Sequence, residues 1–415
     1  MRADEAARAG HGNPASVQPV HGLSLDRYGV GKTTAKPLIP LFDIRLAEEE
    51  IEAVAEALRS GWLTMGPRTE AFEEEFSRHL GARHAVALAS GTAALHLAYL
   101  AAGVGPGDEV VVPSLTFVAT AAAARYCGAT PVFADIRGSY DLGIDPDDVE
   151  ARIGSRTKAI CAVHYGGYLA DVDRLRELAE SRGIALIEDA AHHPAVAPTG
   201  LAACFSFFSN KVLGSGEGGV LATDDDGVAD LARSRRSHAM TSGTWDRHRG
   251  HAADYDVVGL GYNYRMDEPR AALLSARLAG LADDMARRRR LVHRYRDLLR
   301  EVPGVIVPYR DDEVDASSCY VMPVIVERPE LRDPLRRLML ERDHVQTSVL
   351  YPAVHELSAY ADKAGELLPR SELAARSELT LPLYPHLEEA DQDRVVAALR
   401  DGLGELDTTT AAADG

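Results

Sequence analysis

Short apolar runs alternate with amphipathic segments between residues 85 and 260. Each run has the length of a strand and carries apolar side chains at consecutive positions, as expected of strands that are buried on both faces of a sheet. Helix-length segments separate most of the runs, and this alternation predicts a mainly parallel sheet covered by helices. The seven predicted strands are 85–89, 109–113, 131–136, 159–165, 185–190, 204–208 and 218–223.

Further patterns lie on both sides of this block. An apolar stripe at helical spacing predicts a first helix over Glu48–Ser60, and a second stripe predicts a long helix over about 267–300. After the long helix, sparser elements predict a smaller α/β domain of roughly 100 residues. These elements are strands at 319–326 and 345–350 and helices near 329–342 and 388–402.

The patterns divide the chain into four segments. Residues 1–36 and 406–415 are rich in small and charged side chains without periodicity, so we expect a disordered N-terminal arm and a disordered tail. Residues 37–265 form the predicted large domain. Residues 266–405 form the predicted long linking helix and small C-terminal domain.

Charge and hydropathy limit the partners of the chain. The formal net charge of −18 argues against nucleic acid, whose phosphates would repel such a surface. A basic run at Arg287–Arg290 lies in a charge-dense helical pattern and is interpreted as a solvated helix face. Since no apolar run is long enough to span a bilayer and residues 1–22 lack the apolar core of a signal peptide, we expect a cytoplasmic protein without a membrane partner.

The first candidate for chemistry is the tripeptide Ser90-Gly91-Thr92. It follows a predicted strand and opens an Ala- and Leu-rich helix. Free backbone N–H groups and the helix dipole at such a junction attract an anion, and Gly91 allows close approach. A plain helix N-cap is an equally good interpretation of these three residues.

The second candidate is the segment Glu188–His192 at the end of another predicted strand. Carboxylates at the carboxyl ends of parallel strands lie where doubly wound sheets bind ligands. A buried Asp189 could pair with a protonated ring nitrogen, although helix capping would also explain it. His192 and His193 suggest a metal, but no third ligand follows at suitable spacing, so no metal site is predicted.

The third candidate is Lys211, which follows the aromatic run FSFFSN and precedes the glycine-rich run at 214–219. A lysine at a strand edge among apolar side chains is partly desolvated and loses its proton readily, as a Schiff-base lysine must. A surface lysine in a loop is the alternative. A phosphate cradle, a carboxylate and such a lysine together match the requirements of pyridoxal phosphate.

Seven ordered motifs extend this agreement over residues 38–402. On these motifs the chain resembles the DegT/StrS family of sugar aminotransferases, which implies the fold-type I aspartate-aminotransferase architecture. The motifs are SGWLTMGP (60–67), SGTAALHLA (90–98), GPGDEVVVPSLTFVATAAAA (105–124), EDAAH (188–192), FSFFSNKVLGSGEGGVLATDD (205–225), GYNYRMDE (261–268) and QTSVLYPAVH (346–355).

The resemblance implies roles around the cofactor ring. Lys211 would carry pyridoxal phosphate as a Schiff base and move the proton during transamination. Asp189 would pair with the pyridine nitrogen, Phe117 would stack on the ring, and His192 would lie near it. Leu350 is a departure, because many members of the family have a histidine there.

The resemblance also implies how the phosphate is held. Gly91, Thr92 and Ser206 would bind it within the subunit, and Asn263 would reach it from the neighbouring subunit. The expected assembly is therefore a homodimer with shared active sites. The segment between His193 and Ser206 is shorter than usual in the family, so the resemblance does not predict the shape of the substrate pocket at this place.

The expected function is transfer of an amino group from glutamate or glutamine to the keto group of a nucleotide-linked keto-deoxysugar. Such a step would belong to secondary-metabolite or glycan biosynthesis, for example that of an antibiotic. The alternative acceptors are a keto-cyclitol or another ketone. A non-catalytic regulatory protein on the same fold is a further alternative, but it would need a lost lysine or a DNA-binding module.

Overall fold

The structure is a computed structural model that describes residues 37–242, 250, 254–363 and 367–413. The predicted N-terminal arm over 1–36 lies outside the described residues. Among the helices of the described part, none combines the length and the apolar character that a membrane crossing requires. Residues from Leu38 onward group into one compact unit, and all that follows concerns this unit.

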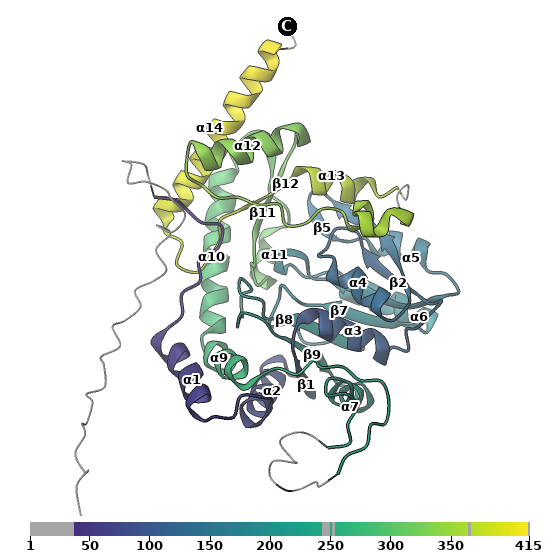
Figure 1. Ribbon diagram of the computed structural model, residues 1–415. Coiled ribbons are helices and arrows are strands. Elements are labelled where there is room, and N and C mark those ends of the chain that lie inside the picture. Colours follow the sequence, from purple (N-terminus) through teal and green to yellow (C-terminus); the bar gives the residue numbers. More distant parts are fainter. Residues whose placement is uncertain (1–36, 243–249, 251–253, 364–366, 414–415) are drawn as a thin grey trace, which may run out of the picture. The chain divides into compact units, whose positions relative to one another are not determined.

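A seven-stranded sheet forms the centre of this unit, and its strands match the seven predicted runs (Figure 1). Six of the seven strands run in the same direction. The exception is β9, which runs antiparallel to both of its neighbours, β1 and β8. The mainly parallel α/β sheet predicted from the sequence is confirmed. In sheet order the strands are β1 (His84–Leu88), β9 (Gly219–Thr223), β8 (Ala202–Ser206), β7 (Ala185–Asp189), β6 (Thr157–Val163), β2 (Glu109–Pro113) and β3 (Thr130–Ala134).

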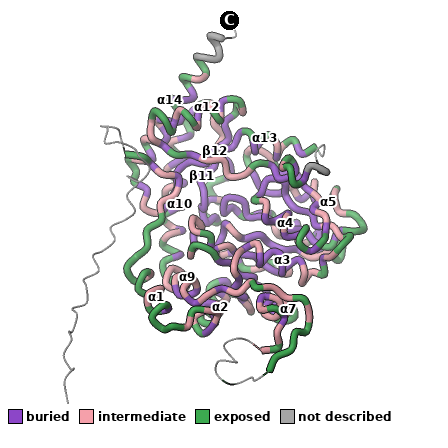
Figure 2. Tube along the Cα trace, viewed as in Figure 1, coloured by how far each residue is buried: buried purple, intermediate pink, exposed green. Residues whose placement is uncertain are grey.

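Helices bury both faces of this sheet, as the continuous apolar strands require. Strand β2 shows the alternation, since Val110 and Val112 join one core cluster and Val111 joins another on the opposite face. Figure 2 shows the sheet as a continuous buried region. The helices of this part are α1 (Glu48–Arg59), α2 (Pro67–Leu80), α3 (Gly91–Ala101), α4 (Ala119–Tyr126), α5 (Pro146–Arg152), α6 (Val172–Arg182) and α7 (Asp226–Arg235), and β4 (Ile136–Gly138) pairs with β5 (Asp141–Ile144).

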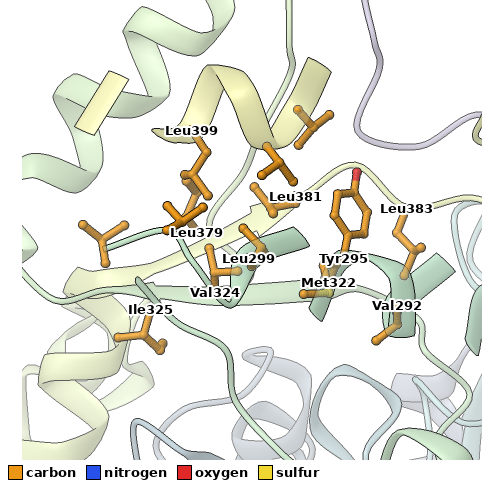
Figure 3. Packing of buried hydrophobic residues seen from close by; sticks show 14 of the residues in the cluster. Val292, Tyr295, Leu299, Met322, Val324, Ile325, Leu379, Leu381, Leu383 and Leu399 are labelled. Atoms are coloured by element: carbon orange, nitrogen blue, oxygen red, sulfur yellow. The ribbon is translucent and has the colours of Figure 1, made fainter. Parts of the chain in front are cut away.

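A three-stranded antiparallel sheet follows, in the order β10 (Val305–Ile306), β11 (Met322–Val326) and β12 (Glu378–Leu381). Its strands pack their apolar side chains against α10 and α14, as Figure 3 shows for Val324, Leu379, Tyr295 and Leu399. The helices around it are α10 (Leu281–Leu299), α11 (Asp311–Ala316), α12 (Pro329–Glu341), α13 (Pro369–Ser377) and α14 (Glu389–Ala413).

The single long helix predicted over 267–300 is wrong. The chain forms α9 (Glu268–Leu278) and α10, which meet at Ala279 and Gly280. Glycine is a poor helix former, and here its N–H turns back to the carbonyl of Arg277 at 3.1 Å. In Figure 1, α10 then runs from α9 toward the three-stranded sheet.

Two further expectations for the C-terminal part need correction. Residues 345–350 form isolated bridges to Ile39 and Thr380 rather than a strand, because their pairing changes from the N-terminal segment to the edge of β12. The predicted disordered tail is helical as far as Ala413. Residues 405–413 contain no glycine or proline that would end α14 earlier. The division into large and small domains stays a prediction.

The carboxylate of Glu268 connects the start of α9 to the start of α2. Helix α2 begins after Gly66, which has no side chain to cap the free N–H groups of the first turn. Glu268 is buried, and it accepts hydrogen bonds from the N–H groups of Gly66, Arg68 and Thr69, each at 2.9 Å. The hydroxyl of Thr69 adds a fourth at 2.8 Å. A residue 200 positions away thus caps α2.

We expect Glu268→Ala to lower the free energy of unfolding by about 3 kcal/mol, because it leaves several buried donors without an acceptor. Glu268→Gln should lower it less, since the amide oxygen still accepts at one side. Urea denaturation followed by circular dichroism measures the change, with the exposed Glu49→Ala on α1 as the control. Equal midpoints for Glu268→Ala and Glu49→Ala would show that the cap contributes little.

Candidate active site

A pocket of about 520 Å³ opens at the carboxyl ends of β7 and β8. Seven of the eight predicted site residues line it, and only Asn263 does not. The pocket joins side chains from both sheets, because residues of the 348–351 segment and Thr380 of β12 form part of its wall. The seven residues are Gly91, Thr92, Phe117, Asp189, His192, Ser206 and Lys211.

The N-terminus of α3 forms one wall of the pocket. Ser90 is its N-cap, and the Ser90 hydroxyl accepts from the N–H of Ala93 at 3.1 Å. Ser90 therefore caps the helix, as one interpretation held. The tripeptide can also bind an anion, because Gly91 and Thr92 line the pocket and their first-turn N–H groups have no acceptor within the helix. A Cβ at Gly91 would lie 2.8 Å from Cβ of Ser206, so only glycine lets α3 approach β8 this closely.

Two adjacent carboxylates at the end of β7 have opposite environments. Glu188 accepts from the Thr199 amide and hydroxyl, the Gly200 amide and His164, and these bonds outweigh burial and lower its pKa. Asp189 is 6% exposed. Burial raises its pKa, offset in part by the Thr120 hydroxyl at 2.8 Å and the Ala191 amide at 3.1 Å. Among the described residues, no cationic side chain contacts the oxygens of Asp189, although the charge of Lys211 in the same pocket lowers its pKa.

Lys211 lies in the turn after β8, where its N–H donates to the carbonyl of Phe208 at 2.8 Å. Burial lowers the pKa of its ammonium group to about 7, although the charge of Asp189 acts in the opposite direction. Its Nζ atom lies 4.4 Å from the centre of the Tyr320 ring. The side chain therefore exists largely as a neutral amine just above neutral pH, in line with the desolvated lysine predicted from the sequence.

An aromatic group surrounds the lysine. The His192 ring stacks on Tyr320 with centroids 4.5 Å apart, and its Nε2 lies 3.0 Å from the hydroxyl of Tyr351. Its Nδ1 accepts from the Gly166 amide, and burial holds the pKa of His192 well below its usual range. The neutral ring therefore carries its proton on Nε2 and donates it to Tyr351. Phe117 is half exposed at the pocket, 5.4 Å from the Tyr351 ring.

Four residues of this site were not identified from the sequence: Thr120, Asn210, Tyr320 and Tyr351. Tyr320 contacts the lysine, and its hydroxyl donates to Oδ1 of Asn210 at 3.1 Å. Tyr351 orients His192, and Thr120 binds Asp189. Thr120, Asn210 and Tyr351 lie in the family motifs, but nothing in the motifs marks these positions. Tyr320 is the second residue of the predicted strand 319–326 and lies in no motif, so the local sequence does not mark it as a site residue.

Asn263 does not line the pocket. Its backbone bridges to Ser237, and its side chain is exposed. The carbonyl of the next residue, Tyr264, accepts from the amide of Ala89 at 2.8 Å, so this loop lies beside the start of α3. The predicted role of Asn263 depends on a second subunit, and that role stays a prediction.

The pocket suits the cofactor predicted from the sequence. A phosphate fits the unpaired amides at the start of α3, a protonated ring nitrogen fits the buried Asp189, and an aldehyde fits the neutral amine of Lys211. The model of the DegT/DnrJ/EryC1/StrS aminotransferase family matches residues 45–400. The chain belongs to this family. It is a pyridoxal-phosphate-dependent aminotransferase of fold type I.

Individual relatives support the assignment. The spore coat polysaccharide biosynthesis protein SpsC of Bacillus subtilis (strain 168) is 38% identical over 369 residues, which cover 86% of this chain and 95% of SpsC. Solved DesV of S. venezuelae is 36% identical with a TM-score of 0.81, covering 88% of this chain and 98% of DesV. The aminotransferase TlmJ of Streptoalloteichus hindustanus is 35% identical with a TM-score of 0.82, covering 89% and 100%.

The low pKa of Lys211 is directly measurable. We expect reductive ¹³C-methylation of cofactor-free protein to give five lysine signals at most, one of which titrates near pH 7 and disappears in Lys211→Ala. Burial lowers this pKa, so the amine should be neutral above pH 7 and charged below it. A titration of that signal near pH 10 would contradict the desolvated environment.

Asp189→Asn should keep the fold and bind the cofactor, but it should lose at least about tenfold in kcat, equal to about 1.4 kcal/mol of barrier. The neutral amide cannot hold a proton on the pyridine nitrogen. Steady-state kinetics measures the loss, and Asp147→Asn on the surface of α5 serves as the control. A variant with nearly unchanged kcat would exclude this role for Asp189.

Proposed function

We propose that this enzyme transfers an amino group from glutamate or glutamine to the keto group of a nucleotide-linked keto-deoxysugar. The observation that carries the chemistry is the pairing of a buried Asp189 without a cationic partner and a partly buried Lys211 with a lowered pKa in one pocket. The sugar acceptor rests on the relatives, among them a protein of spore coat polysaccharide biosynthesis. SpsC supports a place in glycan biosynthesis, whereas a place in secondary metabolism rests on the family resemblance alone.

The side chains divide the work between charge and proton transfer. Bound pyridoxal phosphate supplies an electron sink for the substrate carbon. Asp189 holds a proton on the pyridine nitrogen, and Thr120 and Ala191 fix the orientation of its carboxylate. With a pKa lowered to about 7, the Lys211 amine would take up the proton from the substrate carbon and deliver it to the carbon that comes from the cofactor's aldehyde group, which completes the amino transfer.

The remaining residues bind and orient. The amides of Gly91 and Thr92 and the hydroxyl of Ser206 hold the phosphate, at the point where α3 packs on β8. Phe117 offers its exposed ring face for stacking. His192 is held by hydrogen bonds to Gly166 and Tyr351, so that its ring has a fixed position in the wall of the pocket where the cofactor would bind.

A homodimer with shared sites is part of this proposal. Asn263 has an exposed side chain that does not line the pocket of its own subunit. An asparagine in such a place can reach the phosphate of a partner subunit. Its role therefore follows the resemblance and not the contacts within one chain.

The acceptor class can be tested with a panel of nucleotide-linked keto-deoxysugars, keto-cyclitols and simple ketones, with glutamate and glutamine as donors. We expect turnover with at least one nucleotide-linked sugar and values of kcat/KM at least about a hundredfold lower for the other acceptors, because unmatched polar groups cost several kcal/mol. Mass spectrometry identifies the aminated product, and Lys211→Ala serves as the inactive control. Preference for a keto-cyclitol would contradict the sugar assignment.

A further inference from the structure

A second pocket of about 380 Å³ lies directly beside the first. The two pockets share Phe42, Asn210 and Lys211, so the lysine forms part of the wall of both. The rest of the second pocket comes from Ser209 and Val212 beside the lysine, from the N-terminal segment 43–50, from α9 and α10, and from residues 384–386. None of the site roles assigned above uses this space.

The two pockets differ in their cations. Among the described residues, no arginine lines the active-site pocket, whereas Arg45, Arg277, Arg287 and Arg288 line the second one. Glutamate and glutamine carry at least one carboxylate, and carboxylates are bound most strongly by arginine. The cations suited to an amino donor therefore lie on the far side of Lys211.

Arg288 is built into this pocket and is not a solvated side chain. The interpretation of Arg287–Arg290 as a solvated helix face is wrong at this position, because Arg288 is 5% exposed. Its Nη1 makes only long contacts of 3.4 Å to the carbonyls of Cys319, Tyr320 and Leu383, and its buried Nε has no hydrogen-bond partner. Burial lowers the pKa of this guanidinium to about 10. The Nε atom is closed to a ligand, so an anion in the pocket would meet the Nη groups, whose contacts with the protein are long.

Arg287 adds an accessible cation one residue away. It is exposed, it lines the second pocket, and the described residues give it no ion pair. Arg277 approaches from α9, where its Nε lies 3.7 Å from Glu50. The break at Gly280 separates these two arginine-bearing helices, so cations from both α9 and α10 reach the same pocket.

Acidic groups balance these cations. Asp43, Glu50 and Asp284 also line the pocket, and Asp43 is held by His386 at 2.6 Å. A diphosphate would meet these carboxylates as repulsive groups, whereas an amino acid brings an ammonium as well as carboxylates. Mixed charge in a small pocket therefore favours the amino donor over the nucleotide.

We propose that this second pocket is the carboxylate-binding subsite of the amino donor, with Arg287 and Arg288 as the anion-binding residues beside Lys211. This inference rests on the proposed function only in the choice of amino donor. A donor whose carboxylates lie against these arginines has its amino group next to Asn210 and Lys211, at the boundary of the two pockets.

The test compares Arg287→Gln with Arg290→Gln in the cofactor-loaded enzyme. Both residues are exposed arginines on α10, but only Arg287 lines the pocket, so loss of charge is matched. The first readout is binding of glutarate by calorimetry, which needs no turnover. The second is the donor half-reaction with glutamate alone, followed through the cofactor absorbance, which needs no sugar acceptor.

We expect Arg287→Gln to weaken glutarate binding and to raise the half-saturating glutamate concentration by about fivefold or more, with Arg287→Lys in between. Arg290→Gln should leave both unchanged, and the KM of the acceptor should not move in either variant. Unchanged glutarate binding in Arg287→Gln, or an effect on the acceptor alone, would overturn the subsite. Failure of the acceptor panel with an intact effect on glutarate would instead overturn the sugar assignment only.

Discussion

The site depends on one electrostatic constraint, the burial of the Asp189 carboxylate with only two hydrogen-bond donors. By comparison, four donors stabilise the charge of the neighbouring Glu188, which has a structural role at the end of the same strand. Burial raises the pKa of Asp189, and its two donors offset this only in part. A buried charge of this kind is stable only with a cation opposite, so the pocket is shaped for a ligand that carries a proton on its ring.

Burial also acts on Lys211, but it lowers the pKa of this cation, whereas it raises the pKa of the Asp189 anion. Burial disfavours its ammonium form, and the nearby Asp189 and Tyr320 ring only partly compensate. The enzyme therefore holds the Asp189 carboxylate and the neutral amine of Lys211 in one cavity. The cofactor would supply a protonated ring nitrogen to the carboxylate and an aldehyde to the amine. The aromatic group of His192, Tyr320 and Tyr351 keeps this geometry by ring stacking and one hydrogen bond.

The sequence predicted the large sheet well and the connections less well. Seven apolar runs became the seven strands, because a strand buried on both faces needs consecutive apolar residues and leaves a strong local pattern. β12 was missed because its first residue is the buried Glu378, whose contact with the amide of Leu350 comes from the fold and not from the local sequence. Asp189 and Lys211 lie in motifs, but Tyr320 touches the lysine across 109 positions, and no local signal records that contact.

The close packing of Gly91 on Ser206 separates two kinds of change open to this enzyme over evolution. A larger residue at Gly91 would clash with Ser206, so the start of α3 and the end of β8 hold their present spacing only with glycine at this position. The opposite wall comes from the segment 348–351, which is joined to β12 by a bridge and by the contact of Leu350 with Glu378. Acceptor preference can therefore diverge at this second wall while the chemistry of the first is inherited unchanged.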